Sequence, residues 1–352
     1  MGVLIEENRN YENYRNNRNS KRGITDQQEG DASKRVLWKT ITKRSKVLQV
    51  LLIGLISAMV VTGCGSKKKE ESKPTVTIGY LPITHALAVF EEKELLEQEN
   101  AEYAIKLQKF SSWTDLTDAL QAGKIDGASM LIELAMNAVS QGIDLKAVAL
   151  GHKDGNVIIA SNEIQTVEDL KGKTFAIPSN QSSHNILLQD MLATAGMTTS
   201  DLTLTQLAPS EMPSSLASGA IDGYCVAEPF GAQAVVQKFG HVLFQSEELW
   251  EDSQCCALVL RNAFIQDNQT IADQLINTYM GAGKQLDTET AQKIAKDYLG
   301  QDEETLKESL QWIRYDDLEL TKEAYDVLVE KTKVYGINEA PPTYEDFVYQ
   351  PK

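Results

Sequence analysis

Residues Ala119–Ala138, ALQAGKIDGASMLIELAMNA, are matched later in the chain by Ser215–Ala234, SLASGAIDGYCVAEPFGAQA. In each copy a helical turn ends at a glycine, and an Ile-Asp-Gly step then leads through a short apolar run, typical of a strand, to a glutamate that opens the next helical segment. The glycine before this step, Gly123 or Gly219, fits the position after a helix C-terminus, where the backbone turns left-handed and a Cβ would clash. The repeat predicts two similar α/β lobes. The alternative is that Gly-Xaa-Ile-Asp-Gly is merely a common way to leave a helix.

Strand and helix patterns alternate on both sides of the repeat, which predicts mainly parallel sheets with helices on both faces. The first lobe is expected over 75–158 and the second over 159–260. A helical part over 261–352 is expected to pack back on the first lobe. A ligand cleft would then lie between the lobes, outside the carboxyl ends of the strands.

The composition is that of a globular protein, with 42% hydrophobic and 24% charged residues in 352. Residues 64–352 carry 23 basic and 44 acidic side chains, a net charge of −21. This acidity argues against nucleic acid as a partner. A small anion remains possible, because backbone N–H groups at a helix N-terminus bind anions locally.

The front of the chain has the pattern of an exported lipoprotein. An apolar run at 47–61 follows several basic residues, and Val61-Thr62-Gly63-Cys64 resembles a lipobox, in which the cysteine is lipidated on sulfur and becomes the new N-terminus. We expect a disordered extension or misassigned start over 1–35, a signal peptide over 36–63, and a lipidated Cys64 with a polar linker over 64–74. The alternative is an export signal cut elsewhere, beside an incidental cysteine.

Cysteine and histidine are sparse and lack zinc-finger spacing. The sequence therefore predicts no metal site and no cofactor. Cys225 and the vicinal Cys255-Cys256 lie in apolar runs, which favours buried thiols, with a Cys225–Cys255 disulfide as a minor alternative.

The loops that follow strand ends hold the candidate binding residues. Asn180-Gln181-Ser182-Ser183-His184 precedes a helix and suits a sulfonate, nitrate, carboxylate or phosphate, or else supplies an ordinary helix cap. Trp113 and Phe230 could enclose an apolar ligand part or pack in the core. Glu133 and Glu228 could bind an amine or simply favour a helix N-terminus. No nucleophile elbow, P-loop, dinucleotide fingerprint or metal-spaced cluster occurs in the sequence.

Three segments, at 76–90 (VTIGYLPITHALAVF), 119–155 and 223–235 (GYCVAEPFGAQAV), resemble the nitrate, sulfonate, taurine and bicarbonate (NitT/TauT) family of substrate-binding proteins of ABC importers. That family also includes members for thiamine-precursor pyrimidines. The resemblance implies the type II periplasmic-binding-protein fold, in which two lobes close by a hinge on one ligand. The implied ligand contacts are Thr84, His85, Ser112, Trp113, Ser129, Met130, Ser182, Ser183, His184, Glu228 and Phe230.

Met130 stands where nitrate and bicarbonate receptors have a tryptophan, and no acidic calcium site is evident. Both features favour a sulfonate or an aromatic, pyrimidine-like solute. The resemblance implies a monomeric, non-catalytic lipoprotein on the outer face of the cell membrane, anchored by acyl chains and serving an ABC permease and its ATPase. The alternative is an enzyme on the same fold, of the thiamine-pyrimidine or menaquinone-pathway type; Cys255-Cys256 does not reproduce the dense cysteine motif of the synthase.

Overall fold

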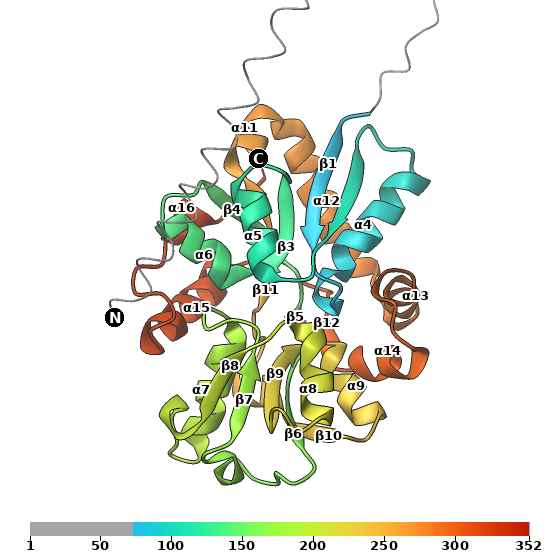
Figure 1. Cartoon of the computed structure of the whole chain (residues 1–352). Helices are drawn as coiled ribbons and strands as arrows, with labels where there is room; N and C mark the ends of the chain where they lie inside the picture. Colours follow the sequence, from blue (N-terminus) through green and yellow to red (C-terminus); the bar gives the residue numbers. More distant parts are fainter. Residues whose placement is uncertain (1–72, 352) are drawn as a thin grey trace, which may run out of the picture. The chain divides into compact units, whose positions relative to one another are not determined.

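Two five-stranded sheets organise residues 73–351, the part of the chain that this computed structural model describes (Figure 1). The first sheet has the strand order β2-β1-β3-β11-β4, and the second has the order β10-β6-β9-β7-β8. The strands of the first sheet are β1 (Thr75–Tyr80), β2 (Ala104–Lys109), β3 (Gly127–Leu131), β4 (Leu145–Leu150) and β11 (Cys256–Arg261). Those of the second are β6 (Asn156–Ser161), β7 (Thr174–Ile177), β8 (Thr203–Gln206), β9 (Gly223–Ala227) and β10 (Gly240–Gln245).

The two sheets have equivalent topologies. In the first, β1 pairs parallel with β2 and β3, and β11 runs antiparallel between β3 and β4. In the second, β7 pairs parallel with β8 and β9, and β6 runs antiparallel between β9 and β10. Each reversed strand directly follows a segment that crosses between the lobes: the first crossing, 151–155, leads into β6, and the second crossing, 246–255, leads into β11. The predicted pair of similar α/β lobes is therefore confirmed. The sheets are mixed rather than mainly parallel in their pairing, because the reversed strand makes two of the four pairings in each sheet antiparallel.

The aspartate of the repeated Ile-Asp-Gly step ties each repeat to its neighbouring strand. Asp126 Oδ2 accepts the Thr77 N–H at 2.9 Å, while the Asp126 N–H donates to the Thr77 carbonyl at 2.8 Å. Asp222 and Thr174 make the same two hydrogen bonds, also at 2.9 and 2.8 Å. The side chain thus extends the sheet by one bond where the strand begins, which explains why both copies carry it.

The glycines of the repeat have two separate roles. Gly123 and Gly219 are left-handed, with φ of +67° and +74°, as the sequence predicts for the residue after a helix. Gly127, which opens β3, instead permits a close approach. A Cβ there would lie 2.4 Å from Leu260 Cδ2 and 2.9 Å from a backbone carbonyl of β11. The second glycine of the motif therefore makes room for the returning strand.

The returning strand β11 belongs to the first lobe, whereas the boundary predicted at residue 260 places it in the second. Its register pairs Ala257 with Met130 of β3 and with Leu150 of β4. The apolar run CALVL could be buried in either sheet, so its sequence does not distinguish them. The pairing moves residues 256–260 from the second lobe to the first.

Helices cover both sheets and fill the C-terminal part. The longer ones are α4 (Leu87–Gln98), α5 (Trp113–Gln121), α6 (Ile132–Ser140), α7 (Ser183–Thr194), α9 (Phe230–Val236), α12 (Gln269–Gln285), α13 (Thr288–Leu299), α14 (Glu303–Ser309) and α15 (Lys322–Val334). The shorter ones are α8 (Met212–Ala217), α10 (Ser246–Leu249), α11 (Asn262–Asp267) and α16 (Tyr344–Phe347), with 3-10 turns η1 (Thr84–Ala86), η2 (Glu168–Leu170), η3 (Thr199–Asp201) and η4 (Pro209–Glu211).

The C-terminal part contacts both lobes rather than the first alone. On the first lobe, α12 packs against α4, and the Tyr279 hydroxyl donates to the Leu150 carbonyl at 3.1 Å. On the second lobe, α14 packs against α9, and Lys331 of α15 pairs with Asp190 of α7 at 2.8 Å. A short β12 (Ile313–Arg314) also pairs with β5 (Lys153–Asp154), which lies on the first crossing. The prediction that this part packs on the first lobe is thus incomplete.

Among residues 73–351, no helix is both long and apolar enough to cross a membrane. The predicted extension, signal peptide and lipidation site at Cys64 lie outside the described residues.

Candidate functional site

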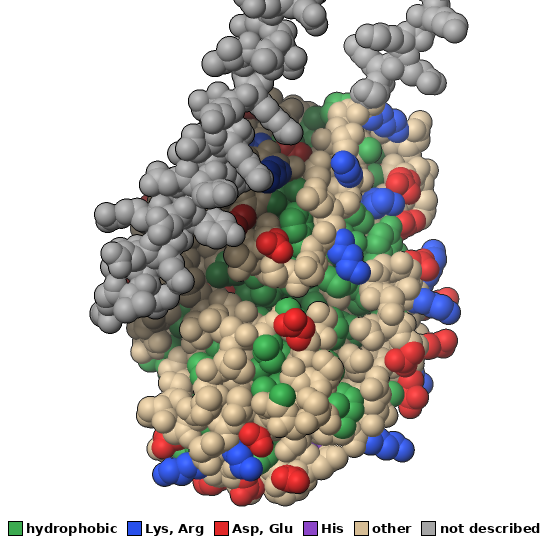
Figure 2. Space-filling model, in the orientation of Figure 1, with side chains coloured by type: hydrophobic (Ala, Val, Ile, Leu, Met, Phe, Trp, Pro, Cys, Tyr) green, Lys and Arg blue, Asp and Glu red, His purple; other side chains and the backbone are tan. Residues whose placement is uncertain are grey.

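A cavity of about 450 Å³ opens where the strand ends of the two lobes face each other. The first lobe contributes the loops after β1 and β2, and the second contributes the start of η4 and of α9. In the same orientation as Figure 1, Figure 2 shows apolar surface in the middle of the molecule, at the height where the two sheets meet. The lining residues are Leu81, Pro82, Ile83, Lys109, Phe110, Ser111, Pro209, Ser210 and Phe230. Of the predicted ligand contacts, Phe230 therefore lines this cavity.

Beside the cavity the lobes touch through Thr84 and Glu228, two further predicted contacts. The Thr84 hydroxyl and backbone N–H both donate to the Glu228 carbonyl, at 3.0 and 2.9 Å. The Tyr315 hydroxyl, from the C-terminal part, donates to the Thr84 carbonyl at 2.8 Å. These bonds hold the two lobes and the C-terminal part together at one point.

Several predicted residues are buried with polar atoms that lack a hydrogen-bond partner. In the first lobe these are the Ser129 hydroxyl and both Glu133 carboxyl oxygens, and in the second they are the Ser183 hydroxyl and both His184 nitrogens. Each of these residues is at most 2% exposed. Because leaving one buried polar group unpaired costs about 1–3 kcal/mol, such a gathering indicates a place where a ligand or water completes the bonding.

Burial also sets the protonation of this group. It raises the pKa of Glu133 well above its usual range, and the nearby Cys255 adds to the effect. It lowers the pKa of His184 to about 4, so this imidazole is neutral at pH 7. Burial raises the pKa of Glu228 to about 8, although the Ala232 N–H donates to its Oε2 at 3.0 Å. A protonated carboxyl and a neutral imidazole can each donate a hydrogen bond to an acceptor atom on a ligand.

Next to this group lies a cluster of four fully buried residues, His85, His152, Cys255 and Cys256. Each offers one ring nitrogen or sulfur, and these four atoms lie within 4.8 Å of one another. The two imidazole rings stack with centroids 3.4 Å apart. The prediction of buried thiols is confirmed, and Cys225, Cys255 and Cys256 are all free, so the alternative disulfide is wrong. This cluster is not evident in the sequence, because His85, His152 and the adjacent cysteines come from three separate segments that only the topology brings together.

The other predicted contacts are either bonded within their own lobe or buried in it. Ser112 caps α5 by accepting the Asp115 N–H at 3.2 Å, and Trp113 is buried with its indole N–H unpartnered. The Ser182 hydroxyl donates to the Ser179 carbonyl at 2.7 Å. Met130 is fully buried in β3. Their roles in binding stay predictions.

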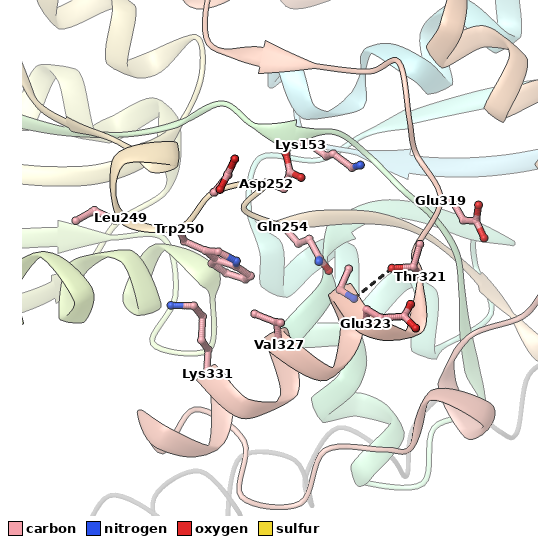
Figure 3. A pocket seen from close by; sticks show the side chains of 12 residues that line it. Lys153, Leu249, Trp250, Asp252, Gln254, Glu319, Thr321, Glu323, Val327 and Lys331 are labelled. Atoms are coloured by element: carbon pink, nitrogen blue, oxygen red, sulfur yellow. Dashed lines mark hydrogen bonds between the residues drawn. The ribbon is translucent and has the colours of Figure 1, made fainter.

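A larger pocket of about 580 Å³ lies between the second crossing and α15, and contains none of the predicted contacts. Figure 3 shows Lys331 directed toward Trp250 across this pocket, with its ammonium 5.1 Å from the ring centroid. Carboxylates such as Glu323 and Asp252 occupy its rim. This pocket lies beside the segment that connects the lobes, away from the strand ends.

The model of the NMT1-like family matches residues 69–299, more than half of the chain. The chain belongs to the NMT1-like family. A solved structure from Staphylococcus aureus, the ligand-binding component of an ABC-type import system with zinc bound, is 34% identical and has a TM-score of 0.75. That comparison covers 79% of this chain and 97% of the S. aureus chain.

Two curated relatives of this NMT1-like chain are binding proteins. The putative aliphatic sulfonates-binding protein of Escherichia coli is 28% identical over 58% of this chain and 63% of its own length. The nitrate/nitrite binding protein of a Nostoc species is 27% identical over 63% of this chain and 56% of its own. The chain thus matches less than two thirds of the length of either relative.

Proposed function

We propose that this chain is the solute-binding component of an ABC importer, and that it holds a small organic anion between its two lobes. The observation that carries the proposal is that both lobes contribute buried, unpartnered polar atoms; both lobes also line one cavity. A ligand held in this way joins the lobes, which is how a two-lobed receptor distinguishes its loaded form from its empty one.

The lining of the cavity supports an organic anion rather than a small inorganic one. Its side chains are mostly apolar, which suits a hydrocarbon or aromatic portion. Lys109, at the end of β2, is the cation among the lining residues and could pair with an anionic headgroup. An alkanesulfonate combines both features. A pyrimidine-like solute would use the aromatic rings but not the lysine.

The remaining parts of the proposal rest on the sequence pattern and the family. We infer that Cys64 carries the lipid that holds the monomeric protein at the outer face of the cell membrane, where it passes solute to a permease and its ATPase. The binding proteins among its relatives, and the absence of a catalytic motif in the sequence, support a receptor rather than an enzyme. A radiolabelled solute should accordingly be recovered unchanged after incubation with the protein.

The test is thermal unfolding of the full chain in detergent, stripped of bound solute, against taurine, longer alkanesulfonates, nitrate, bicarbonate with and without calcium, and pyrimidine precursors. A solute at 100 times its Kd stabilises the protein by about 2.7 kcal/mol. Lys109→Met should weaken binding of an anion by roughly tenfold or more, since a charge-assisted hydrogen bond contributes about 1.5–3 kcal/mol.

The matched control is Lys106→Met, which removes an exposed lysine from the same strand outside the cavity. It should bind like the unmodified protein. If no compound stabilises the protein, the receptor proposal fails for these solute classes. If Lys109→Met binds an anion as tightly as Lys106→Met does, the anionic headgroup is not held in this cavity.

A further inference from the structure

We propose that His85, His152, Cys255 and Cys256 bind one thiophilic transition-metal ion of the zinc type. This inference goes beyond the proposed function, because it needs neither a solute nor a permease. It rests on the positions of four side chains that are each fully buried. His85 comes from η1 of the first lobe, His152 from the first crossing, and Cys255 and Cys256 from the end of the second crossing and the start of β11.

The hydrogen bonds of the two imidazoles leave one nitrogen of each ring available to a metal. The rings stack with an interplanar angle of 27°, so they would have to turn apart to direct both nitrogens at one ion. His85 Nε2 donates to the Gly155 carbonyl at 3.0 Å, which leaves Nδ1 of a neutral ring with a free lone pair, and this buried Nδ1 has no hydrogen-bond partner. His152 Nδ1 donates to the Asp154 carbonyl at 2.6 Å, which directs its lone pair to Nε2. Metal-binding histidines are typically held in this way, with one nitrogen donating to a carbonyl and the other free for the metal.

The two cysteine sulfurs lie close together, although the residues are neighbours in sequence. Neighbouring residues of a regular strand point to opposite faces of the sheet. Cys255 precedes β11, however, and its Sγ lies 3.9 Å from that of Cys256. A tetrahedral zinc site with Zn–S bonds of about 2.3 Å has an S···S separation of about 3.8 Å. The two sulfurs are therefore already spaced as ligands of one ion and are too far apart for a disulfide, which requires about 2.05 Å.

The net charge of the occupied site also suits its burial. Two thiolates and two neutral imidazoles around a divalent cation give no net charge, which a fully buried site requires. Two thiolates and two imidazoles favour zinc-type ions, whereas magnesium and calcium prefer oxygen ligands. His152 Nε2 accepts a long hydrogen bond of 3.3 Å from the Cys256 N–H, and a metal bound to this nitrogen would displace that bond.

The site would also join the two crossings. Asp154 and Gly155, whose carbonyls hold the histidines, lie on the first crossing, and Cys255 and Cys256 end the second. The Asp154 N–H donates to the Ser253 carbonyl at 3.0 Å, so the crossings are already in contact beside the cluster. A metal bound there would tie the two connections between the lobes together.

The experiment is a Zn²⁺ titration of the reduced, chelator-treated full chain in detergent, with metal content measured by mass spectrometry. We expect one Zn²⁺ per chain. X-ray absorption of the zinc-loaded protein should give a first shell of two sulfurs and two nitrogens, and Co²⁺ should give thiolate charge-transfer bands. Cys255→Ser with Cys256→Ser should weaken binding by more than roughly 100-fold, the upper end of what losing an outer-shell partner costs.

The matched control is Cys225→Ala, because Cys225 is the third buried free thiol of the described residues and stands outside the cluster. It should retain the site. The proposal is overturned if the unmodified chain binds no stoichiometric Zn²⁺, if the first shell lacks sulfur, or if a folded double variant binds as tightly as Cys225→Ala. The X-ray absorption result uses the unmodified chain, so it decides the matter even if the double variant fails to fold.

Discussion

Replacing Glu228 by glutamine should remove a large, pH-dependent destabilisation. This carboxyl is 3% exposed, and its pKa is raised by burial to about 8, against 4.5 for the ordinary side chain. A carboxyl with a raised folded-state pKa stabilises the protein fully below its unfolded pKa, and this stability is lost as pH rises through the folded value. The gap of about 3.5 pH units corresponds to about 5 kcal/mol when both states are ionised.

Glutamine keeps the shape and an acceptor for the Ala232 N–H but cannot ionise. The assay is urea unfolding of the metal-free and solute-free protein, followed by tryptophan fluorescence at pH 5 and pH 8.5. The stability of Glu228→Gln relative to the unmodified chain should increase by about 4 kcal/mol between these two pH values. Taking the difference cancels other buried groups that titrate in both proteins.

Glu163→Gln makes the same chemical change at an exposed glutamate, and should alter stability by no more than about 0.5 kcal/mol at either pH. A raised pKa of Glu228 is refuted if the relative stability of Glu228→Gln is the same at both pH values, or if it falls as pH rises. Either result would mean that the Glu228 carboxyl is not neutral in the folded protein near pH 7.

Two further changes test the packing of the first lobe by urea unfolding. Gly127→Ala should destabilise the protein by about 1–3 kcal/mol, because its Cβ would lie 2.4 Å from Leu260 Cδ2. The control is Gly281→Ala in α12, where a Cβ meets open space, and it should be neutral or stabilise the protein by up to about 1 kcal/mol. Equal effects at the two glycines would disprove the close approach of β11. Tyr279→Phe should cost about 1 kcal/mol by removing the bond to the Leu150 carbonyl, and an unchanged midpoint would show that this bond contributes nothing.

The sequence could predict the paired lobes because the repeat carries its own structural reasons. Gly123 and Gly219 do turn left-handed, and Asp126 and Asp222 do sit at equivalent sheet positions. The sheet that receives β11 could not be predicted, because an apolar strand is compatible with burial in either sheet. Because β11 pairs with β3 and β4, the second crossing runs beside the first, and Cys256 lies beside the two imidazoles.

Part of the candidate site could be predicted from where its residues stand relative to strands and helices. Ser183, His184 and Phe230 follow strand ends or begin helices, and such loops meet in a two-lobed α/β fold. The cluster of His85 and His152 with the vicinal cysteines was not predictable from spacing, since zinc signatures assume ligands close together in sequence. The two histidines and the cysteine pair are far apart along the chain, and they come together because η1 and the two crossings meet in the fold.

Hydrogen exchange with and without solute tests most directly whether the ligand is held between the lobes. The sample is the full chain with the solute that most stabilises it, and the peptides compared cover residues 127–133 of the first lobe and 179–187 of the second. We expect the solute to slow exchange in both peptides together, because side chains from each lobe complete their hydrogen bonds on it. Protection confined to one lobe, or no protection with any solute of the panel, would contradict it.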